Sequence, residues 1–500
     1  MLPDPHRRRI DLPLALAAVF AVLWAVARAS VQSITMDEAD TYLSFVSRTA
    51  PFHWWAFSNN HILNSALMRM FTLIFGVSHL TVRLPALIGG AIYIGVCRYL
   101  CVLLPARAAL RFPLFLCLVY NPFVFDFLVA ARGYSWAMAL LLCIVAVSAA
   151  GLPRNASTAK LCAACSALAA LSFTSNFSFA FADFAVLLMV LLWIWRERGF
   201  SLRSLAAAIV PGALVVVMLP LPTLLKWPPD QLYAGAMSLR QTFGSVIHWS
   251  LYEVNPEVAN PLMVQVMQRL EHRLFPLLGL VVAWRLVLLF LNREKPTHEH
   301  TSEQTKWLKS LAVVLTSATA LATVLHWVAF HAFGLLLPLD RTALFYVPLC
   351  TLAVGVIAAI PIESRMGRAS YYACVTMSVL FALHFVFSMR LTYFGEWRYD
   401  ADVKKVYGAL AGYNHDDCVD RVASNWIYTA SLNFYRTLSG RESFSEFPPG
   451  FVLPEDALVY VLHANLDRKF IDAQKLTVVF RGESTDAVIA VRPGLARCRQ

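Results

Sequence analysis

Residues 12–40 read LPLALAAVFAVLWAVARASVQSITMDEAD, an apolar run that ends in a cluster of acids. From about Leu12 to Ala29 the run approaches the length needed to cross the hydrocarbon core of a bilayer. Three arginines at positions 7–9 precede the run, so the N-terminal segment as a whole resembles a signal peptide. The run is long for a signal sequence, however, and no good cleavage site precedes the acids. We therefore predict a retained first transmembrane helix.

The composition indicates a membrane protein. Hydrophobic residues make up 58% of the chain and charged residues 15%, and the mean hydropathy is +0.59. A soluble domain carries roughly 25% charged residues, because these cover its surface. The net charge of +11 does not indicate nucleic acid as a partner. The Lys and Arg residues lie in short clusters between apolar blocks and not on one basic face.

Apolar blocks along the whole chain predict an α-helical polytopic membrane protein. About eleven blocks of about 17–25 residues can each span the bilayer. They lie near residues 12–31, 80–104, 112–130, 134–151, 159–173, 176–195, 204–225, 274–292, 310–333, 342–361 and 369–390. An odd number of spans places the two termini on opposite sides of the membrane.

The distribution of basic residues predicts the orientation in the membrane. With the N-terminus in the cytoplasm, the inner segments hold Arg7, Arg8, Arg9, Arg107, Arg111, Arg154, Lys160, Arg196, Arg198, Arg203, Arg293, Lys295, Lys306, Lys309, Arg365 and Arg368. The short outer turns near 131–133, 174–175 and 334–341 hold only Arg132 and Arg341. This asymmetry follows the positive-inside rule. We expect a plasma (inner) membrane protein with its longer loops, at about 31–79 and 226–273, outside.

The chain divides into a transmembrane module over residues 1–392 and a polar segment over residues 393–500. The polar segment combines a helical stretch near Trp426–Leu438 with strand-like runs at Ala457–His463, Leu476–Arg481 and Ala487–Arg492. These patterns predict a small extracytoplasmic α/β domain. Cys418 and Cys498 could pair in an oxidising space, although nothing in the sequence shows that they meet.

Three acids follow the first helix in Met36-Asp37-Glu38-Ala39-Asp40. A carboxylate at the membrane surface could take a proton from a hydroxyl acceptor or hold a divalent cation. Acids also favour the first turn of a helix, so a solvated helix start fits the pattern equally well. Asp37 and Glu38 are therefore candidates for catalysis, and for metal binding if a metal is used.

The segment Asn59-Asn60-His61-Ile62-Leu63-Asn64 leads into an amphipathic stretch that ends at Phe75. Asn60 and Asn64 share one helix face, with His61 beside them. These side chains could bind sugar hydroxyls. They could equally cap and solvate a helix that lies at the membrane surface.

Arg132 and Arg341 are basic residues on the side of the membrane where such residues are rare. An arginine at this depth usually has an anionic partner. One interpretation is an ion pair, with Asp126 for Arg132 and a different acid for Arg341. The other is the phosphate of a lipid, which arginine binds in a bidentate way.

Two further polar residues lie at or within spans. Arg83 marks the outer entrance of the second span, where we expect its side chain to snorkel to the surface. Asp183 lies inside an apolar span, where it is either a functional residue or a polar packing partner.

The order of these motifs resembles the GT-C superfamily of membrane glycosyltransferases. The resembling branch is the bacterial one, related to dolichyl-phosphate-mannose protein mannosyltransferases and aminoarabinose transferases. The likeness covers about residues 10–400 and rests on Asp37-Glu38-Ala39, Asn60-His61-Ile62-Leu63, Phe75-Gly76-Val77-Ser78 before Arg83-Leu84-Pro85, Ala131-Arg132-Gly133-Tyr134, and Arg341 followed by Tyr346 and Pro348. The family commonly has His-Pro-Pro and Arg-Pro-Tyr where this chain has His61-Ile62-Leu63 and Arg132-Gly133-Tyr134.

The resemblance implies an inverting transfer of a sugar from a polyprenyl-phosphate donor to a cell-envelope acceptor, which is a lipid, polysaccharide or protein. It implies Asp37 as the base, with Glu38 beside it, and Arg341, Arg132 and Tyr346 as ligands of the donor phosphate. Asn60, His61, Asn64 and Tyr134 would then contact the substrate. A divalent cation is left open, because a monophosphate donor has little charge to neutralise. Aromatic residues of the second outer loop could stack on a sugar or simply mark the membrane interface: Trp227, Tyr233, Trp249 and Tyr252.

Two other classes of function remain open. A transporter or flippase of lipid-linked sugars would explain the spans and Asp183 without catalysis. Many secondary transporters have two related halves, however, and we find no internal repeat here. A catalytically inactive membrane scaffold is the third possibility.

Overall fold

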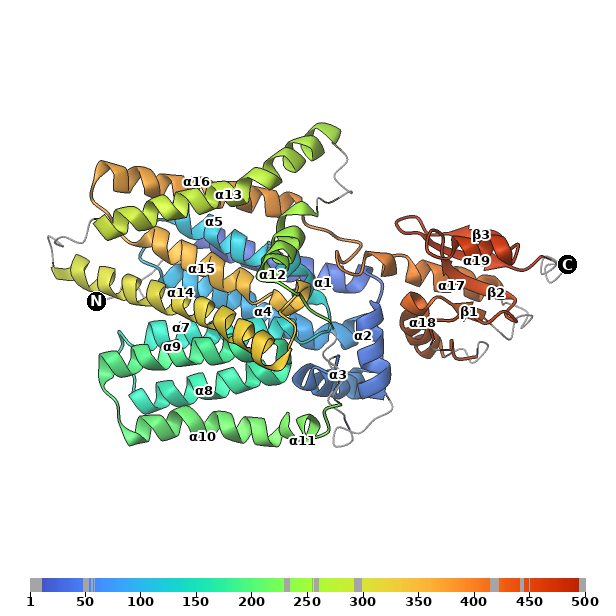
Figure 1. Cartoon of the computed structure of the whole chain (residues 1–500), viewed down its shortest axis with the longest axis horizontal. Coiled ribbons are helices and arrows are strands. Elements are labelled where there is room, and N and C mark those ends of the chain that lie inside the picture. The colour runs from blue at the N-terminus through green and yellow to red at the C-terminus, as the bar shows by residue number, and fades with distance from the viewer. Residues whose placement is uncertain are drawn as a thin grey trace.

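Figure 1 shows the computed structural model of the chain, a helical bundle with a smaller domain at one end. The structure describes residues 11–47, 54, 57, 59–228, 234–253, 255, 260–291, 299–413, 422–440, 445–448 and 450–493. Tyr233 and the predicted cysteine pair, Cys418 and Cys498, lie outside the described residues.

Helices make up most of the described chain. They are α1 (Leu12–Val31), α2 (Met36–Thr41), α3 (Ile62–Phe75), α4 (His79–Leu103), α5 (Ala108–Val119), α6 (Pro122–Val129), α7 (Tyr134–Gly151), α8 (Thr158–Ser175), α9 (Ala180–Arg198), α10 (Leu202–Met218), α11 (Leu221–Leu224), α12 (Leu239–Ile247), α13 (Pro261–Leu291), α14 (Glu299–Phe333), α15 (Tyr346–Ala359), α16 (Arg365–Phe387), α17 (Val403–Tyr413), α18 (Trp426–Ser439) and α19 (Arg468–Ala473). Short 3₁₀ or π turns are η2 (Tyr42–Ser47), η4 (Phe177–Phe179), η5 (His248–Tyr252), η6 (Asp340–Ala343) and η7 (Arg398–Asp400).

The bundle confirms a multi-pass helical membrane protein. Within the described part of the chain, 9 helices are long and apolar enough to cross a membrane. The pair α5 and α6 makes a tenth candidate, bent by 56°. The bend follows from Asn121-Pro122, because a residue before proline is pushed out of the helical conformation. Helix α10, in the predicted span 204–225, has only 17 residues. The predicted count of eleven spans is therefore not confirmed.

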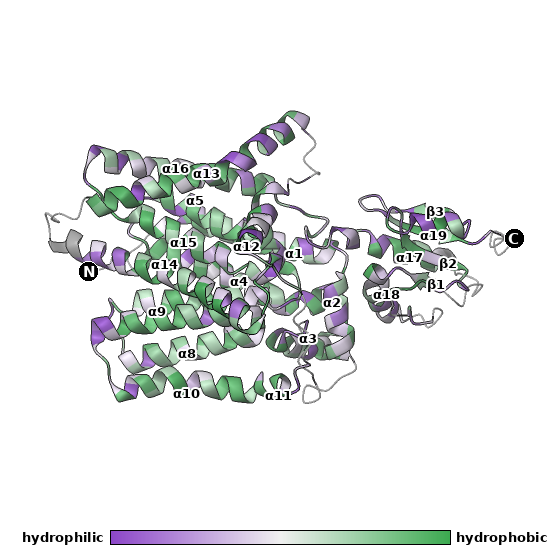
Figure 2. Cartoon of the chain, in the orientation of Figure 1, coloured by the Kyte–Doolittle hydropathy of each residue, from purple (hydrophilic) through white to green (hydrophobic). Residues whose placement is uncertain are grey.

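Burial separates the centre of the bundle from its surface. The best apolar windows of α7 and of the span formed by η6 and α15 are 78% buried, whereas that of α13 is 11% buried. Side chains of α13 such as Leu280 and Phe290 are exposed. Apolar side chains on the outside of a bundle are expected where lipid tails replace water. Figure 2 shows apolar residues along the bundle helices and a more mixed pattern on the smaller domain.

The smaller domain is built on one sheet, which confirms the predicted C-terminal α/β fold. Its strands are β1 (Val422–Ser424), β2 (Val459–His463), β3 (Thr477–Arg481) and β4 (Ala487–Val491), in the order β1-β2-β4-β3. Strand β1 is parallel to β2, and the other pairs are antiparallel. The three predicted strands and the helix near 426–438 are present. Strand β1 was not predicted, because a strand of 3 residues is too short to show a recognisable pattern. The domain boundary at residue 392 stays a prediction.

The smaller domain packs against the end of the bundle that carries α2 and α3 (Figure 1). One apolar cluster joins the two parts: Ile34, Tyr42 and Val82 share it with Val406, Phe434 and Ile489. The rings of Tyr42 and Phe434 meet edge to face at 5.5 Å. The acidic helix α2 is thus held between the membrane helices and the C-terminal domain.

Candidate active site

Helix α2 begins with a capping box that fixes the position of Glu38. Thr35 accepts a hydrogen bond from the Glu38 amide, and the Glu38 carboxylate accepts one from the Thr35 amide. Such reciprocal bonds satisfy two amides that have no partner within the helix. Because Glu38 points back to the start of the helix, its neighbour Asp37 faces a different part of the structure.

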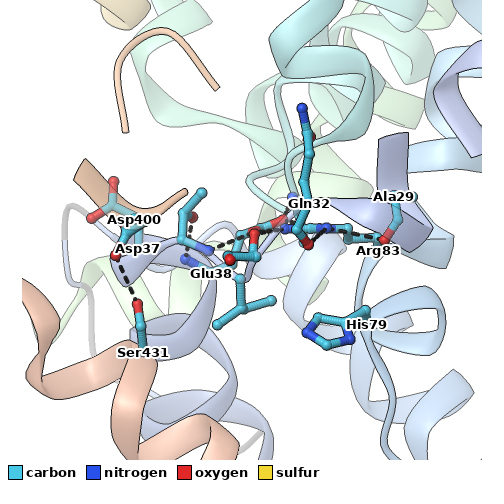
Figure 3. A network of polar contacts seen from close by, with 12 residues as sticks. Ala29, Gln32, Asp37, Glu38, His79, Arg83, Asp400 and Ser431 are labelled. Atoms are coloured by element: carbon cyan, nitrogen blue, oxygen red, sulfur yellow. Dashed lines mark hydrogen bonds and ion pairs between the residues drawn. The ribbon is translucent and has the colours of Figure 1, made fainter. Parts of the chain in front are cut away.

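Both carboxylate oxygens of Glu38 are paired with Arg83. The Arg83 guanidinium donates to both carboxylate oxygens of Glu38, at 2.8 and 2.7 Å. It also donates to the carbonyls of Ala29, Gln32 and Ser33 at the end of α1 (Figure 3). The Ala131 amide donates to the same carboxylate at 2.8 Å. These contacts tie α1, α2, α4 and the turn before α7 together.

The expectation that Arg83 snorkels is wrong, because its side chain is 0% exposed in the ion pair with Glu38. All of its donors meet acceptors inside the protein. Burial raises the pKa of Glu38, but Arg83 and the backbone amides of Thr35 and Ala131 lower it by more, so the net shift is downward. Glu38 is therefore ionised and committed to a structural contact.

Asp37 lies between two arginines. Its Oδ2 atom is 3.0 Å from Nη2 of Arg341 and 3.6 Å from Nη2 of Arg132. Burial raises the pKa of Asp37, but Arg132, Arg341 and hydrogen bonds from Trp397 and Asn59 lower it more. The carboxylate is thus ionised at neutral pH and available to accept a proton.

Arg132 is held in place from several sides. Its guanidinium donates to Thr41 Oγ1 at 2.9 Å, to the Asp37 carbonyl and to the side chain of Asn59. The predicted ion pair between Arg132 and Asp126 is wrong. Asp126 instead binds Arg28 at 2.6 Å and Arg390 at 3.5 Å. The turn at Ala130–Gly133 separates α6 from α7 and directs Arg132 toward α2.

Gly133 makes this turn possible. Its φ angle is +73°, in the region that favours glycine. A Cβ atom there would lie 2.2 Å from the Ser175 carbonyl and 2.9 Å from Cβ of His61. Proline cannot adopt this φ angle. Proline could therefore not replace Gly133 without a change in this turn.

Arg341 is the most accessible member of the cluster, with its side chain 28% exposed, whereas that of Arg132 is 2% exposed. It binds Asp37 and also Glu396, whose side chain is 15% exposed. The Trp397 ring lies 5.4 Å from the guanidinium carbon in a cation–π contact. Arg341 therefore joins α2, η6 and the linker that follows α16.

Glu396 and Trp397 were missed by the sequence reasoning. Their signal was an acid beside a tryptophan immediately after the last span, on the predicted outer face. Burial raises the pKa of Glu396 to about 7, with Asp37 and Asp340 adding to the effect of burial and Arg341 opposing it. The cluster therefore holds one carboxylate whose pKa is lowered, Asp37, and one whose pKa is about 7, Glu396.

His61 lies at the edge of the cluster against Tyr134, with ring centroids 5.4 Å apart. The ring is buried, and neither Nδ1 nor Nε2 has a hydrogen-bond partner. Burial and the charges of Arg132 and Arg341 lower the pKa of His61 well below its ordinary value. It is therefore neutral, with a donor and an acceptor both free for a ligand.

The asparagines and Tyr346 have partners of their own. Asn60 accepts from Ser65 at 3.0 Å, and Asn64 donates to the Ala131 carbonyl at 2.9 Å. The Tyr346 hydroxyl lies 3.0 Å from that of Thr323 on α14. The structure thus brings together Asp37, Arg132, Arg341, His61 and Tyr134. It places Asn64 as a brace for the turn before α7 and Tyr346 against α14.

The pair Asp37 and Glu38 does not fit a shared metal ion. Each carboxylate faces an arginine, and the two lie on different sides of α2. The described residues contain no group of three or more His, Cys, Asp or Glu side chains that could hold a metal.

Trp249 reaches the cluster through Asp340, the neighbour of Arg341, because its Nε1 atom donates a hydrogen bond to Asp340 Oδ1 at 2.8 Å. The Trp227 ring meets that of Phe177 edge to face, and the Tyr252 ring contacts that of His272 at a tilt of 60°. Asp183 is buried within α9, away from these contacts, and neither of its carboxylate oxygens has a hydrogen-bond partner. The structure therefore connects only Trp249 of these described residues to the cluster.

No family model matches the chain, and no curated protein matches it. Several solved structures are similar. The structure of ArnT from Cupriavidus metallidurans without ligand is 12% identical, with a TM-score of 0.43, and the match covers 96% of this chain and 97% of that one. ArnT bound to undecaprenyl phosphate gives the same identity and score, over 97% and 98% of the two chains.

The arabinofuranosyltransferase AftD from Mycobacteria is 13% identical, with a TM-score of 0.45. The match covers 97% of this chain but 36% of AftD. All of these TM-scores are below 0.5, so the function proposed below rests on the residues of this chain. The chain is similar over nearly its whole length to solved structures of ArnT and of the arabinofuranosyltransferase AftD.

Proposed function

We propose that this protein is an inverting glycosyltransferase that uses a polyprenyl-phosphate sugar as its donor. The observation that carries the proposal is the ionised Asp37 carboxylate beside the guanidinium groups of Arg341 and Arg132, at 3.0 and 3.6 Å. A transfer of this kind needs a carboxylate to accept a proton and cations to stabilise a leaving phosphate. Both are present at one end of the membrane bundle.

The proposed reaction is a single displacement. The oxygen of an acceptor hydroxyl forms a bond to the anomeric carbon while the bond from that carbon to the phosphate oxygen breaks. Asp37 accepts the hydroxyl proton, and the electron pair of the broken bond leaves with polyprenyl phosphate. Attack opposite to the leaving group inverts the anomeric carbon.

The two arginines have different roles in this scheme. Arg341 is partly exposed and would bind the donor phosphate in a bidentate way. Arg132 is buried and braced by Thr41 and Asn59, so it would hold a fixed positive charge behind Asp37. When a phosphate takes Arg341, Asp37 loses one of the charges that lower its pKa, and becomes a stronger base.

The location of the site suits a lipid-linked donor. The cluster lies where α2 and η6 meet the end of the bundle, so a polyprenyl tail can remain in the bilayer while its phosphate reaches Arg341. His61 and Tyr134 line the cluster and would contact the sugar. The positive-inside pattern supports placing this end outside the plasma membrane. The acceptor would then be a lipid, polysaccharide or protein of the cell envelope.

The test uses purified protein in lipid nanodiscs and a panel of polyprenyl-phosphate sugars, with envelope lipids as acceptors. Loss of donor and the appearance of transferred or released sugar are measured by mass spectrometry. We expect the wild-type protein to consume at least one donor. No consumption of any donor, together with passage of a lipid-linked sugar across vesicles that contain the protein, would support a flippase instead.

A further inference from the structure

Glu396 and Asp37 share one guanidinium group, that of Arg341. Glu396 contacts Nη1 and Asp37 lies 3.0 Å from Nη2. The Oε2 atom of Glu396 is buried and has no hydrogen-bond partner. Glu396 thus occupies one of the two terminal nitrogens with which Arg341 would bind a phosphate in a bidentate way.

The charges of the cluster are balanced without a ligand. Arg132 and Arg341 carry two positive charges, and above pH 7, where Glu396 is ionised, Asp37 and Glu396 carry two negative ones. A polyprenyl-phosphate sugar is a phosphodiester and brings one more negative charge. Like charges close together in a partly desolvated site disfavour each other strongly. The diester can therefore bind well only if one carboxylate leaves the cluster or takes up a proton.

Glu396 is better placed than Asp37 to give up its contact. Its side chain is 15% exposed, compared with 8% for Asp37. The main chain around it is anchored, because the Gly395 amide donates to Asp126 at 2.8 Å and the Trp397 ring packs on Phe127 at 5.4 Å. Rotation of the Glu396 side chain alone would uncover Arg341.

We propose that Glu396 is an internal substitute for the donor phosphate, which holds Arg341 in the donor-free protein and is displaced when the phosphate binds. The inference rests on the proposed function and deepens it. Glu396 is here a positioning residue, because it acts through Arg341. It keeps the guanidinium oriented toward the incoming phosphate while the site is empty.

The displacement couples donor binding to proton uptake. The pKa of Glu396 is about 7, raised by burial and by Asp37 and Asp340, with Arg341 opposing. Tyr134 and Tyr399 are also close enough to Glu396 to interact with it electrostatically. Loss of Arg341 and the arrival of a phosphate both raise this pKa further. Below pH 7 Glu396 already holds its proton, so binding changes little with pH. Above pH 7 binding requires a proton, and affinity should fall by up to about tenfold per pH unit.

The test measures binding of a phosphodiester probe between pH 6 and 9. The methyl diester of polyprenyl phosphate is suitable, because it keeps one negative charge throughout, whereas a monoester has its own pKa near 6. We expect the Kd of the wild-type protein to rise steadily above pH 7. Glu396→Gln should bind with a Kd that hardly changes with pH and is about tenfold or more lower than wild type at pH 8. Asp472→Asn, at an exposed position on α19, should behave like wild type.

A second measurement does not depend on the variant being folded. Calorimetry of the wild-type protein at pH 8, in two buffers of different ionisation enthalpy, counts the protons taken up on binding. About one proton per probe supports the inference, and none overturns it. Binding that is independent of pH, or Glu396→Gln that binds more weakly at every pH, also overturns it. In those cases the proposed function stands, whereas a wild-type protein that binds no diester at any pH contradicts the proposed function itself.

Discussion

The Nη2 atom of Arg341 lies 3.0 Å from the Oδ2 atom of Asp37, although the two residues are separated by most of the chain. Asp37 follows the first span and Arg341 begins a late one. Their meeting places a carboxylate and a guanidinium group side by side at one end of the bundle. The predictions below separate the roles of these residues from those of their neighbours.

Asp37→Asn should reduce transfer by about 10² or more, the usual contribution of a positioned base. The amide keeps the size of the side chain but cannot accept the proton. Donor binding should survive, because Arg341 and Arg132 remain. Initial rates and donor Kd are measured together, with Asp472→Asn as the matched control. Unchanged transfer would remove Asp37 from the role of base and direct attention to Asp40 and Asp126.

Arg341→Ala should raise the apparent KM for the donor and slow transfer, because the leaving phosphate loses its partner. Arg341→Lys should recover only part of the activity, since a point charge does not reproduce the planar fork of arginine. Arg468→Ala, at an exposed position on α19, is the control. Steady-state kinetics of the three variants would show wild-type values throughout if Arg341 were only a member of a structural ion pair.

Glu38→Gln should destabilise the protein and act on chemistry only through the fold. It leaves the Arg83 guanidinium buried without its anion, and breaking such a pair costs about 3–5 kcal/mol. Thermal unfolding in detergent measures the loss. Glu483→Gln, which breaks the exposed pair with Lys405, should unfold close to wild type. A stable Glu38→Gln protein without activity, and a wild-type protein inactivated by EDTA, would instead indicate a metal shared by Asp37 and Glu38.

A cysteine introduced at Ser445 should react with a membrane-impermeant reagent from outside the cell. Ser445 is exposed in the C-terminal domain, and this domain packs on the end of the bundle that carries α2. The positive-inside pattern predicts that this end is outside. Labelling of intact cells and of inverted vesicles, in a background without other reactive cysteines, measures it. Labelling only from the cytoplasmic side would reverse the orientation and the proposed face of the reaction.

The sequence by itself determined the fold class and several members of the site. Long apolar blocks have only helical solutions in a bilayer, because each backbone amide and carbonyl must be satisfied within its own segment. Short runs rich in apolar and β-branched residues, at 457–463, 476–481 and 487–492, likewise predicted β2, β3 and β4 correctly. Arg132 and Arg341 attracted attention because arginine is rare at their depth, and the structure brings both to Asp37.

Only the tertiary structure decided which charges pair. Glu38 and Asp37 are adjacent and chemically alike, but the capping box turns Glu38 back toward Arg83 and leaves Asp37 to Arg341. Glu396 joins them through a linker that carries no periodic pattern. The formation of an ion pair depends on the distance between two side chains and on their burial. The number of residues between them in the sequence gives neither quantity. Local sequence patterns therefore predicted the helices and strands. Which carboxylate pairs with which arginine depends on how α2 packs against the bundle, and only the tertiary structure shows this.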